Sequence, residues 1–206
     1  MRQGEAVVAI WNDVVAEGLA AFHAWHIGEH MPERVAIPGF LRGRRAIAPD
    51  GSPSFFTLYE VASLEVLTGH DYTARLNAPT EATQANIPNF RNTVRALAHV
   101  VAGSGHGAGG WIETLRLDER PGEEVLRFLL ASPRIVAAHL CRTDMAASGI
   151  VTREKEGKTR LDRPPEWFLI VEAADAAALD LATPGVAGRR DRFVLEQILA
   201  ETDPGA

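Results

Sequence analysis

The chain has 206 residues, of which 46% are hydrophobic and 23% charged, a composition that can fill a folded core. Its 21 Lys and Arg against 27 Asp and Glu give a net charge of −6, which argues against nucleic acid or an anionic membrane as the main partner. The single cysteine, Cys141, can form neither an intrachain disulfide nor a cysteine-based metal site, which is typical of a reducing compartment. The apolar run near the first residue is too short for a signal peptide or a membrane span, so we expect a cytoplasmic protein.

Hydrophobic periodicity predicts six elements in the first half of the chain, in the order strand, helix, strand, strand, helix, strand. Their ranges are 5–11, 14–31, 40–47, 55–61, 63–75 and 90–101. The same order recurs in the second half, at 110–117, 122–131, 135–142, 167–172 and 174–181, with 193–200 either a strand or a short helix. A βαββαβ order that occurs twice predicts an α+β protein made of two tandem ferredoxin-like repeats.

Residue matches support the duplication. Residues 54–60 align with 166–172, and each segment is followed by a helix N-cap residue, Ser63 or Asp175. The helices of each repeat cover one face of its antiparallel sheet and leave the other face bare. We therefore expect the two sheets to pack together as an intramolecular dimeric α/β-barrel with the helices outside.

The predicted division places the first repeat at 1–102, a glycine-rich linker at 103–110 and the second repeat at 111–206. A polar insertion at 143–165 has only a short turn as its counterpart in the first repeat. We expect it to be a disordered hairpin tip or, alternatively, a lid over the mouth of the barrel.

Three of the seven histidines lie on the first helix, between residues 23 and 30. At about 100° per residue, His26 and His30 fall on the apolar face that this helix buries, while His23 lies at its margin. Two imidazoles are therefore expected to point inward, with Trp25 next to His26 in the sequence.

Three interpretations of this pair remain open. In the first, the histidines are core residues that hydrogen bond to backbone carbonyls or to a carboxylate such as Glu60 or Glu172. In the second, a neutral imidazole is a general base for a small substrate. In the third, His26 and His30 share a metal ion whose third ligand comes from elsewhere. The motif is not H-E-x-x-H, because Glu29 immediately precedes His30.

The strand at 40–47 carries three arginines. Strand alternation places Arg42 and Arg44 on one face and Arg45 on the other. Arg44 is the candidate for binding a planar oxyanion, and the alternative is a solvated edge strand. His139 occupies the position that matches Arg44 in the second repeat, and Tyr59 on the neighbouring strand supplies a hydroxyl group.

Other sequence signals fail because of their context. Residues 105–110 match G-x-G-x-x-G, but a strand follows them instead of a helix, so no helix N-terminus is available for a pyrophosphate. Cys141 lies two residues from His139 on one strand, where a buried small hydrophobe is the usual role of a cysteine. The sequence contains neither a P-loop motif nor a G-x-S-x-G motif.

Residues 25–44 read W-H-x-x-E-H-x-P-E-R-x-x-I-P-G-F-x-R-x-R, and F-F-x-L-Y-E follows at 55–60. This pattern resembles the dimeric α/β-barrel superfamily, and within it the EthD-like bacterial proteins. The resemblance implies ferredoxin-like units that close a barrel, with a pocket between helix and sheet. It also implies His26, His30 and Arg44 as candidate site residues. The superfamily includes cofactor-independent monooxygenases, lactone isomerases, polyketide cyclases and haem enzymes, so that the resemblance does not select one activity.

The function predicted from the sequence is a metal-independent enzyme of oxygenase, isomerase or cyclase type that acts on a small aromatic or lactone-like molecule. His26 or His30 is the base, Arg44 holds an oxyanion, and Trp25, Tyr59 and His139 contact the substrate. The alternatives are a haem- or metal-binding protein and a non-catalytic small-molecule binding module. The sequence identifies no cofactor, and it allows a monomeric pseudo-dimer or a homodimer.

Overall fold

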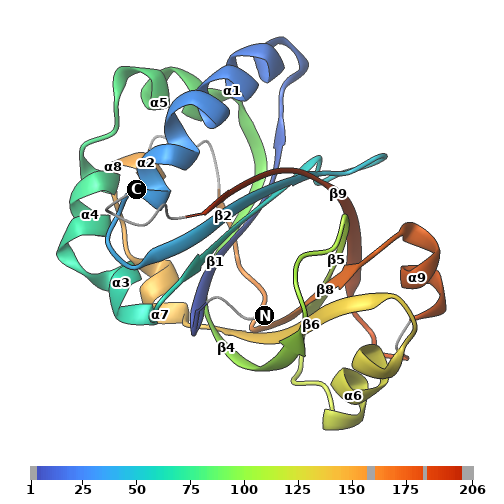
Figure 1. Ribbon diagram of the computed structural model, residues 1–206. Coiled ribbons are helices and arrows are strands. Elements are labelled where there is room, and N and C mark those ends of the chain that lie inside the picture. Colours follow the sequence, from blue (N-terminus) through green and yellow to red (C-terminus); the bar gives the residue numbers. More distant parts are fainter. Residues whose placement is uncertain (1–3, 157–160, 183–184, 201–206) are drawn as a thin grey trace, which may run out of the picture.

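The computed structural model describes residues 4–156, 161–182 and 185–200. Eight antiparallel strands close a barrel, and the helices lie on its outside (Figure 1). A ninth strand, β7 (Leu161–Asp162), pairs in parallel with the first half of β4. The barrel strands are β1 (Ala6–Val14), β2 (Phe40–Ile47), β3 (Phe55–Val61), β4 (Phe90–Gly105), β5 (Trp111–Leu117), β6 (Ile135–Thr143), β8 (Trp167–Ala173) and β9 (Arg189–Ala200).

Both predicted repeats are present, and both have the same strand order. The first follows β4-β1-β3-β2 and the second β9-β5-β8-β6. The edge strands of one repeat pair with those of the other, β2 with β9 and β4 with β6, so that backbone hydrogen bonds close the barrel. The ambiguous segment 193–200 belongs to β9, because its backbone groups find partners in β2 while the earlier part of β9 pairs with β5. The predicted α+β dimeric α/β-barrel is confirmed.

The first repeat carries most of the helices. The predicted helix at 14–31 starts later, because β1 runs to Val14, and it continues to Val35 in several pieces. Those pieces are a 3-10 turn η1 (Ala16–Gly18), α1 (Leu19–Trp25), a π-turn η2 (His26–His30) and α2 (Met31–Val35). The other elements of this layer are α3 (Leu64–Thr68), α4 (His70–Asn77), α5 (Glu81–Asn86) and η3 (Ile87–Asn89), and the second repeat is covered by α6 (Glu123–Ala131) and α9 (Ala176–Leu181). No helix in the described ranges is both long and apolar enough to cross a membrane.

The insertion at 143–165 folds back over the first repeat. Its described residues form α7 (Met145–Gly149), α8 (Arg153–Glu156) and β7. The backbone N–H of Leu97 in β4 donates to Ser148 Oγ at 2.9 Å, which attaches α7 to the outside of the barrel. The expectation of a disordered tip or a lid over the barrel mouth is therefore wrong for this described part, which lies beside α3 and α4 (Figure 1).

The glycine-rich segment at 103–110 begins as regular structure. Residues 103–105 continue β4 and pair with β6, so the long strand joins the two repeats directly. The exact division of the chain into repeats stays a prediction.

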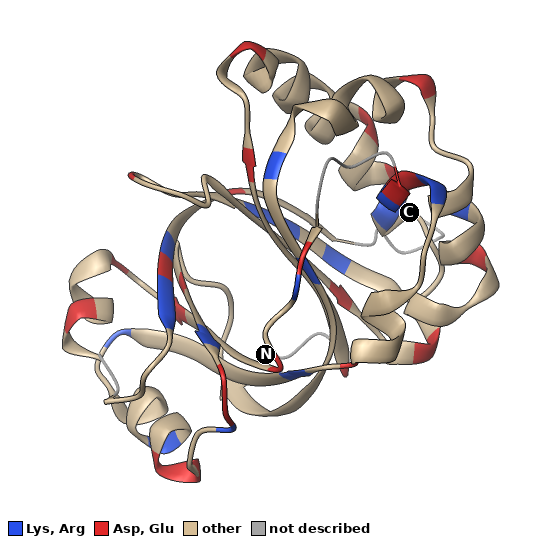
Figure 2. Ribbon diagram, turned by 180° about the vertical axis from the view of Figure 1, so that it is seen from behind, with Lys and Arg blue, Asp and Glu red and all other residues tan. Residues whose placement is uncertain are grey.

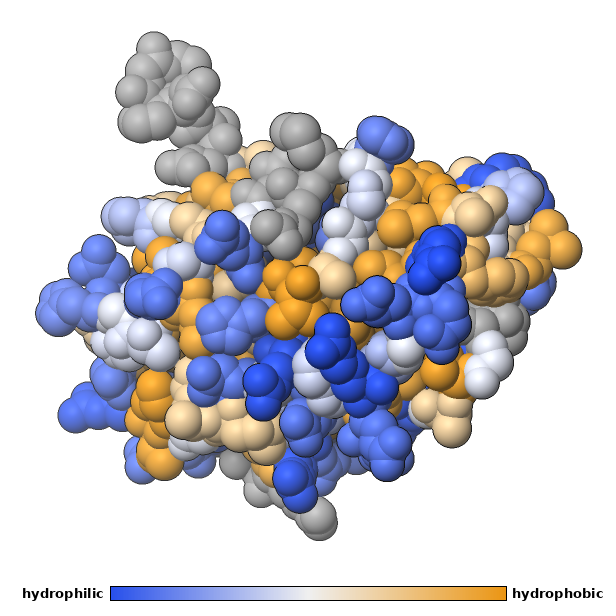
Figure 3. All heavy atoms as spheres, turned by 90° about the horizontal axis from the view of Figure 1, so that it is seen from below, coloured by the Kyte–Doolittle hydropathy of each residue, from blue (hydrophilic) through white to orange (hydrophobic). Residues whose placement is uncertain are grey.

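Successive side chains along each strand point alternately into the barrel and out toward the helices, so the protein has one core inside the barrel and another between the sheet and the helices. Side chains that point inward fill the barrel with a mainly apolar cluster, and side chains that point outward lie under the helices. Hydrophilic and hydrophobic side chains are interspersed over the face shown in Figure 3. The largest inward side chains are Trp11, Phe56, Phe168 and Phe193.

An ion-pair network crosses the interior of the barrel. Arg44 is 2% exposed, and its guanidinium donates to Glu60 at 2.7 Å and to Glu172 of the second repeat at 2.7 Å. Figure 2 shows that positively and negatively charged residues lie on the barrel strands as well as on the helices. The predicted alternation is correct, since Arg44 faces the interior and Arg45 the helices. A buried guanidinium with two carboxylates thus links the repeats.

We expect Arg44→Met to lower the free energy of unfolding by about 3–5 kcal/mol, because it leaves the buried carboxylate of Glu172 without its arginine, while Glu60 keeps its ion pair with Arg42 at 2.6 Å. Urea denaturation followed by tryptophan fluorescence measures this loss. The matched control is Arg134→Met, which breaks an ion pair with Asp175 whose side chains are 47% and 43% exposed. The control should change stability by less than about 0.5 kcal/mol. Equal losses in the two variants would contradict a structural role for the interior network.

Candidate functional site

A π-turn interrupts the first long helix at the predicted histidines. The N–H of Met31 donates to the carbonyl of His26, five residues earlier. Pro32 has no N–H, and in a regular α-helix its ring would clash with the carbonyl of Gly28. The wider π-turn relieves this conflict, and such turns are frequent at functional sites. It also holds His26 and His30 on one face of the helix, with their ring centres 5.4 Å apart.

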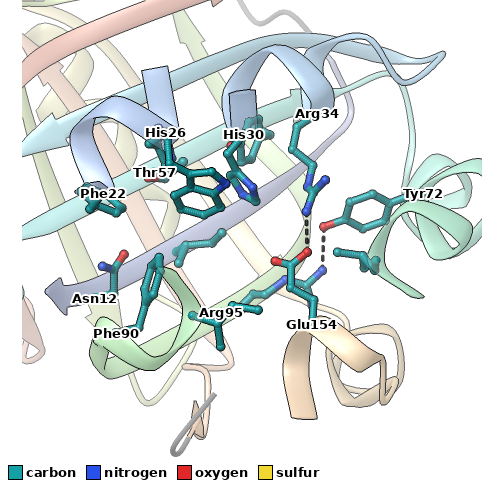
Figure 4. A pocket seen from close by; sticks show the side chains of 15 residues that line it. Asn12, Phe22, His26, His30, Arg34, Thr57, Tyr72, Phe90, Arg95 and Glu154 are labelled. Carbon is teal, nitrogen blue, oxygen red and sulfur yellow. Dashed lines mark hydrogen bonds and ion pairs between the residues drawn. The ribbon is translucent and has the colours of Figure 1, made fainter. Parts of the chain in front are cut away.

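The two histidines line a cavity of about 30 Å³ between this helix and the outer face of the first repeat's sheet (Figure 4). Aromatic and aliphatic side chains form much of its wall, and polar groups enter it from several elements. It is lined by Ile10, Asn12, Phe22, Trp25, His26, His30, Arg34, Thr57, Tyr59, Tyr72, Leu76, Ile87, Phe90, Arg95 and Glu154. A cavity of this size holds about one water molecule.

His26 is buried as a neutral imidazole. It is 3% exposed, and no described residue hydrogen bonds to its Nδ1 atom. The pKa of His26 is lowered from 6.5 to about 3, mainly by burial and then by the positive charges of Arg45 and Arg34. A buried polar group normally has a partner. The ring of His26 is therefore available to a molecule inside the cavity.

His30 and Trp25 complete this side of the cavity. The ring centres of Trp25 and His30 are 4.2 Å apart, and the indole N–H donates to Thr83 Oγ1 of α5 at 3.2 Å. This hydrogen bond fixes the indole against the imidazole. Trp25, predicted as a substrate contact, thus lies in the wall of the same cavity.

The sheet contributes Tyr59 and Thr57, which point outward from β3 toward the helix. The Tyr59 hydroxyl is buried and has no hydrogen-bond partner among the described residues. Burial raises the pKa of Tyr59, so the phenol stays protonated and can donate a hydrogen bond. Gly43 permits this position, because a Cβ there would lie 3.0 Å from the ring of Tyr59.

One end of the cavity is closed by charged residues. Arg34 of α2 is 3% exposed and forms an ion pair with Glu154 of α8 (Figure 4). Burial disfavours the charge of Arg34, but the surrounding groups, of which the carboxylate of Glu154 contributes most, together outweigh this effect and raise the pKa of Arg34. Beside this pair, Arg95 donates to the hydroxyl of Tyr72 at 2.7 Å.

Two predicted site residues lie elsewhere. Arg44 and His139 point into the barrel, where His139 lines a separate interior cavity of about 20 Å³ together with Arg44. The sheet stands between them and the histidines of the helix, so the expected single site of His26, His30 and Arg44 is not assembled. Arg45 lies on the histidine side instead, with its guanidinium 5.6 Å from the ring centre of Phe22.

Three residues of the cavity were not predicted from the sequence: Thr57, Arg34 and Glu154. Thr57 could have been found by alternation, because it lies two residues before Tyr59 on one strand. Arg34 belongs to the recognised motif at 25–44 but was given no role. Glu154 has no local signal, since it lies 120 residues from Arg34 in the sequence.

The residues of this cavity do not fit a haem group. Drug-sized ligands already need pockets of about 300 Å³ or more, and the haem macrocycle is at least as large. The cavity has about one tenth of that volume, and the ring centre of Trp25 lies 4.2 Å from that of His30. In the described part of the chain, no group of three or more His, Cys, Asp or Glu side chains could hold a metal ion.

Comparisons with known proteins identify the fold. No family model and no curated protein matches the sequence. A proposed monooxygenase from Fusobacterium nucleatum has a similar structure, with a TM-score of 0.60 at 10% identity over 96% of this chain and 95% of that one. An anthrone oxidase-like protein has a TM-score of 0.57 at 9% identity over 96% of this chain and 93% of that one. A haem-binding protein from Thermus thermophilus has a TM-score of 0.50 at 11% identity, over 94% of this chain and 92% of that one.

At these identities the comparisons establish the architecture alone. The chain has the dimeric α/β-barrel fold that the sequence predicts, with both halves of the barrel in one polypeptide.

The low pKa of His26 makes stability depend on pH. The unfolded chain binds a proton at this residue near pH 6.5 and the folded chain near pH 3, so the stability contributed by burial is complete above 6.5 and is lost as the pH falls toward 3. Denaturation at several pH values should give a slope of up to about 1.4 kcal/mol per pH unit from this residue. We expect His26→Gln to remove that part of the slope, and His70→Gln, whose side chain is 90% exposed, to retain it. Parallel curves for His26→Gln and the wild type would contradict the buried neutral imidazole.

Proposed function

We propose that the cavity on the first repeat binds a small aromatic molecule and that His26 accepts a proton from it. The observation that carries this proposal is a buried neutral imidazole whose Nδ1 atom has no hydrogen bond from any described residue, in a wall of aromatic side chains. Concave, mainly apolar sites with a few convergent polar groups are typical of small-molecule binding. A histidine within reach of a bound molecule is the commonest general base.

The surrounding charges suit the formation of an anion. Burial, and then the charges of Arg45 and Arg34, lower the pKa of His26 and make it a weak base. The same two cations stabilise negative charge that develops on a substrate. Once an anion forms, it offsets their effect and raises the pKa of His26 toward neutrality. The hydroxyl of Tyr59 donates a hydrogen bond to the carbonyl oxygen where the negative charge collects.

The reaction class that fits these groups is removal of a proton from a carbon next to a carbonyl group or conjugated with one, which can lead to oxygenation, isomerisation or cyclisation. Two of the structures similar to this chain are described as a proposed monooxygenase and an anthrone oxidase-like protein. Anthrone is therefore the probe for this reaction class, and its three rings enter only if the cavity opens beyond the volume of about 30 Å³ described above. Its CH₂ group loses a proton to His26, and the carbanion is oxidised by dioxygen as co-substrate, so that one anthrone and one O₂ give one anthraquinone and one water.

The test measures oxygen uptake and anthraquinone absorbance with anthrone in air, above the rate in buffer alone. We expect His26→Gln to lower the protein-dependent rate by about 100-fold or more, since general bases contribute 10²–10⁴-fold. The matched control is His23→Gln on the same helix, whose histidine is one-third exposed, interacts with Glu196 and does not line the cavity. An unchanged rate in His26→Gln, or equal losses in both variants, would overturn the proposed role of His26.

The small volume of the cavity favours a second candidate, a binding module without catalysis. Its signature is saturable binding of an aromatic probe without turnover in the wild-type protein. A titration with haemin tests the third sequence-based alternative, and the poor fit described above leads us to expect no saturable Soret band.

A further inference from the structure

The insertion of the second repeat places a carboxylate in the cavity of the first. Glu154 lies on α8, is 8% exposed, and its carboxylate meets the guanidinium of Arg34 (Figure 4). The preceding residue, Arg153, lines a separate outer groove of about 410 Å³ formed with residues of the α4–α5 and α5–β4 connections. Ile87 lines both the groove and the cavity. The short helix α8 thus separates the cavity from the groove.

Arg34 has the properties of an anion-binding side chain. It is almost completely buried, and its Nη1 atom has no hydrogen bond among the described residues. Glu33, the other carboxylate near it, is 3.7 Å from Nη1. A guanidinium presents a planar fork that binds a carboxylate through two parallel hydrogen bonds. In this structure, the carboxylate of Glu154 pairs with one of the two amino groups of this guanidinium, Nη2.

The contacts that hold α8 in place are few. The helix has four residues. Arg153 N–H donates to Asn77 Oδ1 at 3.2 Å, and Lys155 Nζ donates to the carbonyls of Ser148 at 3.0 Å and Ile150 at 3.3 Å. The neighbouring Val151 is exposed. Segments with few buried apolar contacts open at low free-energy cost.

We propose that the substrate is an aromatic carboxylate whose carboxylate group replaces that of Glu154 on Arg34, and that α8 moves outward when it binds. The position of the aromatic ring beside His26 rests on the function proposed above, whereas the exchange of carboxylates rests on Arg34 and Glu154 alone. Departure of Glu154 frees the space of its side chain and opens the cavity to the outer groove past Ile87. A site of about 30 Å³ thereby becomes large enough for an aromatic ring.

The exchange is balanced in charge. A neutral aromatic ligand that displaced Glu154 would leave the buried Arg34 with only the more distant carboxylate of Glu33, at 3.7 Å, which is costly. A carboxylate ligand keeps Arg34 paired, and the released Glu154 becomes hydrated outside. Glu154 therefore favours a carboxylate ligand over a neutral ligand of the same shape, and a neutral probe such as anthrone binds with lower affinity.

The test compares benzoate with benzamide, which has a similar shape and no charge. Isothermal titration calorimetry is carried out on the wild type, on Glu154→Gln and on Glu156→Gln, the matched control with an exposed glutamate on the same helix. In the wild type, benzoate should bind at least tenfold more tightly than benzamide, because benzamide gives Arg34 no carboxylate in exchange for that of Glu154. Glu154→Gln should bind both ligands at least tenfold more tightly than the wild type does, because neither has to displace a carboxylate. Glu156→Gln should change neither affinity by more than twofold.

Three further measurements cover movement, stability and the position of the carboxylate. Amide hydrogen exchange at residues 152–156 should become faster when benzoate binds to the wild type, and should not respond to benzamide. If Glu154→Gln is less stable because Arg34 has lost its partner, benzoate should restore its melting temperature and benzamide should not. The variant Glu154→Asp, whose carboxylate is retracted by one methylene, should bind benzoate with intermediate affinity.

Equal affinities of the wild type for benzoate and benzamide, equal effects of Glu154→Gln and Glu156→Gln, or no benzoate binding to any variant would each overturn the proposal. These outcomes are independent of the anthrone assay. If benzoate binds as expected and His26→Gln keeps full anthrone turnover, the role of His26 as a base is excluded and the carboxylate site is supported. If benzoate does not bind as expected but His26→Gln loses anthrone turnover, the carboxylate site is excluded and the role of His26 as the base is supported.

Discussion

Closure of the barrel by backbone hydrogen bonds along both edges is the constraint on which the rest of the structure depends. Strand β2 pairs with β9 and β4 pairs with β6, so that neither repeat keeps an open edge. Closure also fixes which face of each strand is internal. The interior receives Arg44 with its two carboxylates, and the outer face of the first repeat receives Thr57 and Tyr59. Two features therefore determine where the cavity lies. Alternation along the strands decides which side chains face outward, and the π-turn widens the helix that covers them.

Local patterns predicted much of this arrangement. The strands at 40–47 and 55–61 have the predicted bounds, because alternation and turn residues act over a few positions. Helical periodicity placed His26 and His30 on the buried face correctly. The helix bounds at 14–31 were wrong because the pairing of β1 extends that strand to Val14. No periodicity within the helix indicates that pairing.

The remaining errors in the prediction concern which face of a strand packs against which helix. Alternation showed that Arg44 and Arg45 lie on opposite faces, but it could not show which of the two faces the helix covers. That choice depends on pairing between strands far apart in the sequence. The contact between Arg34 and Glu154 is of the same kind, since it joins the motif of the first repeat to an insertion in the second. A disordered tip was expected at 143–165 because its contacts with β4 and α4 lie outside the segment itself.

A barrel that is hydrogen-bonded on both sides has no hinge between its halves. Rotation of one repeat against the other would break two complete strand pairings at once, so the usual closure of two lobes around a ligand is not available to this chain. Access to buried groups must come through the outer layer, where short helices move one at a time. The rate at which molecules enter and leave would then be governed by the local opening of a four-residue helix, while the barrel beneath it keeps its shape.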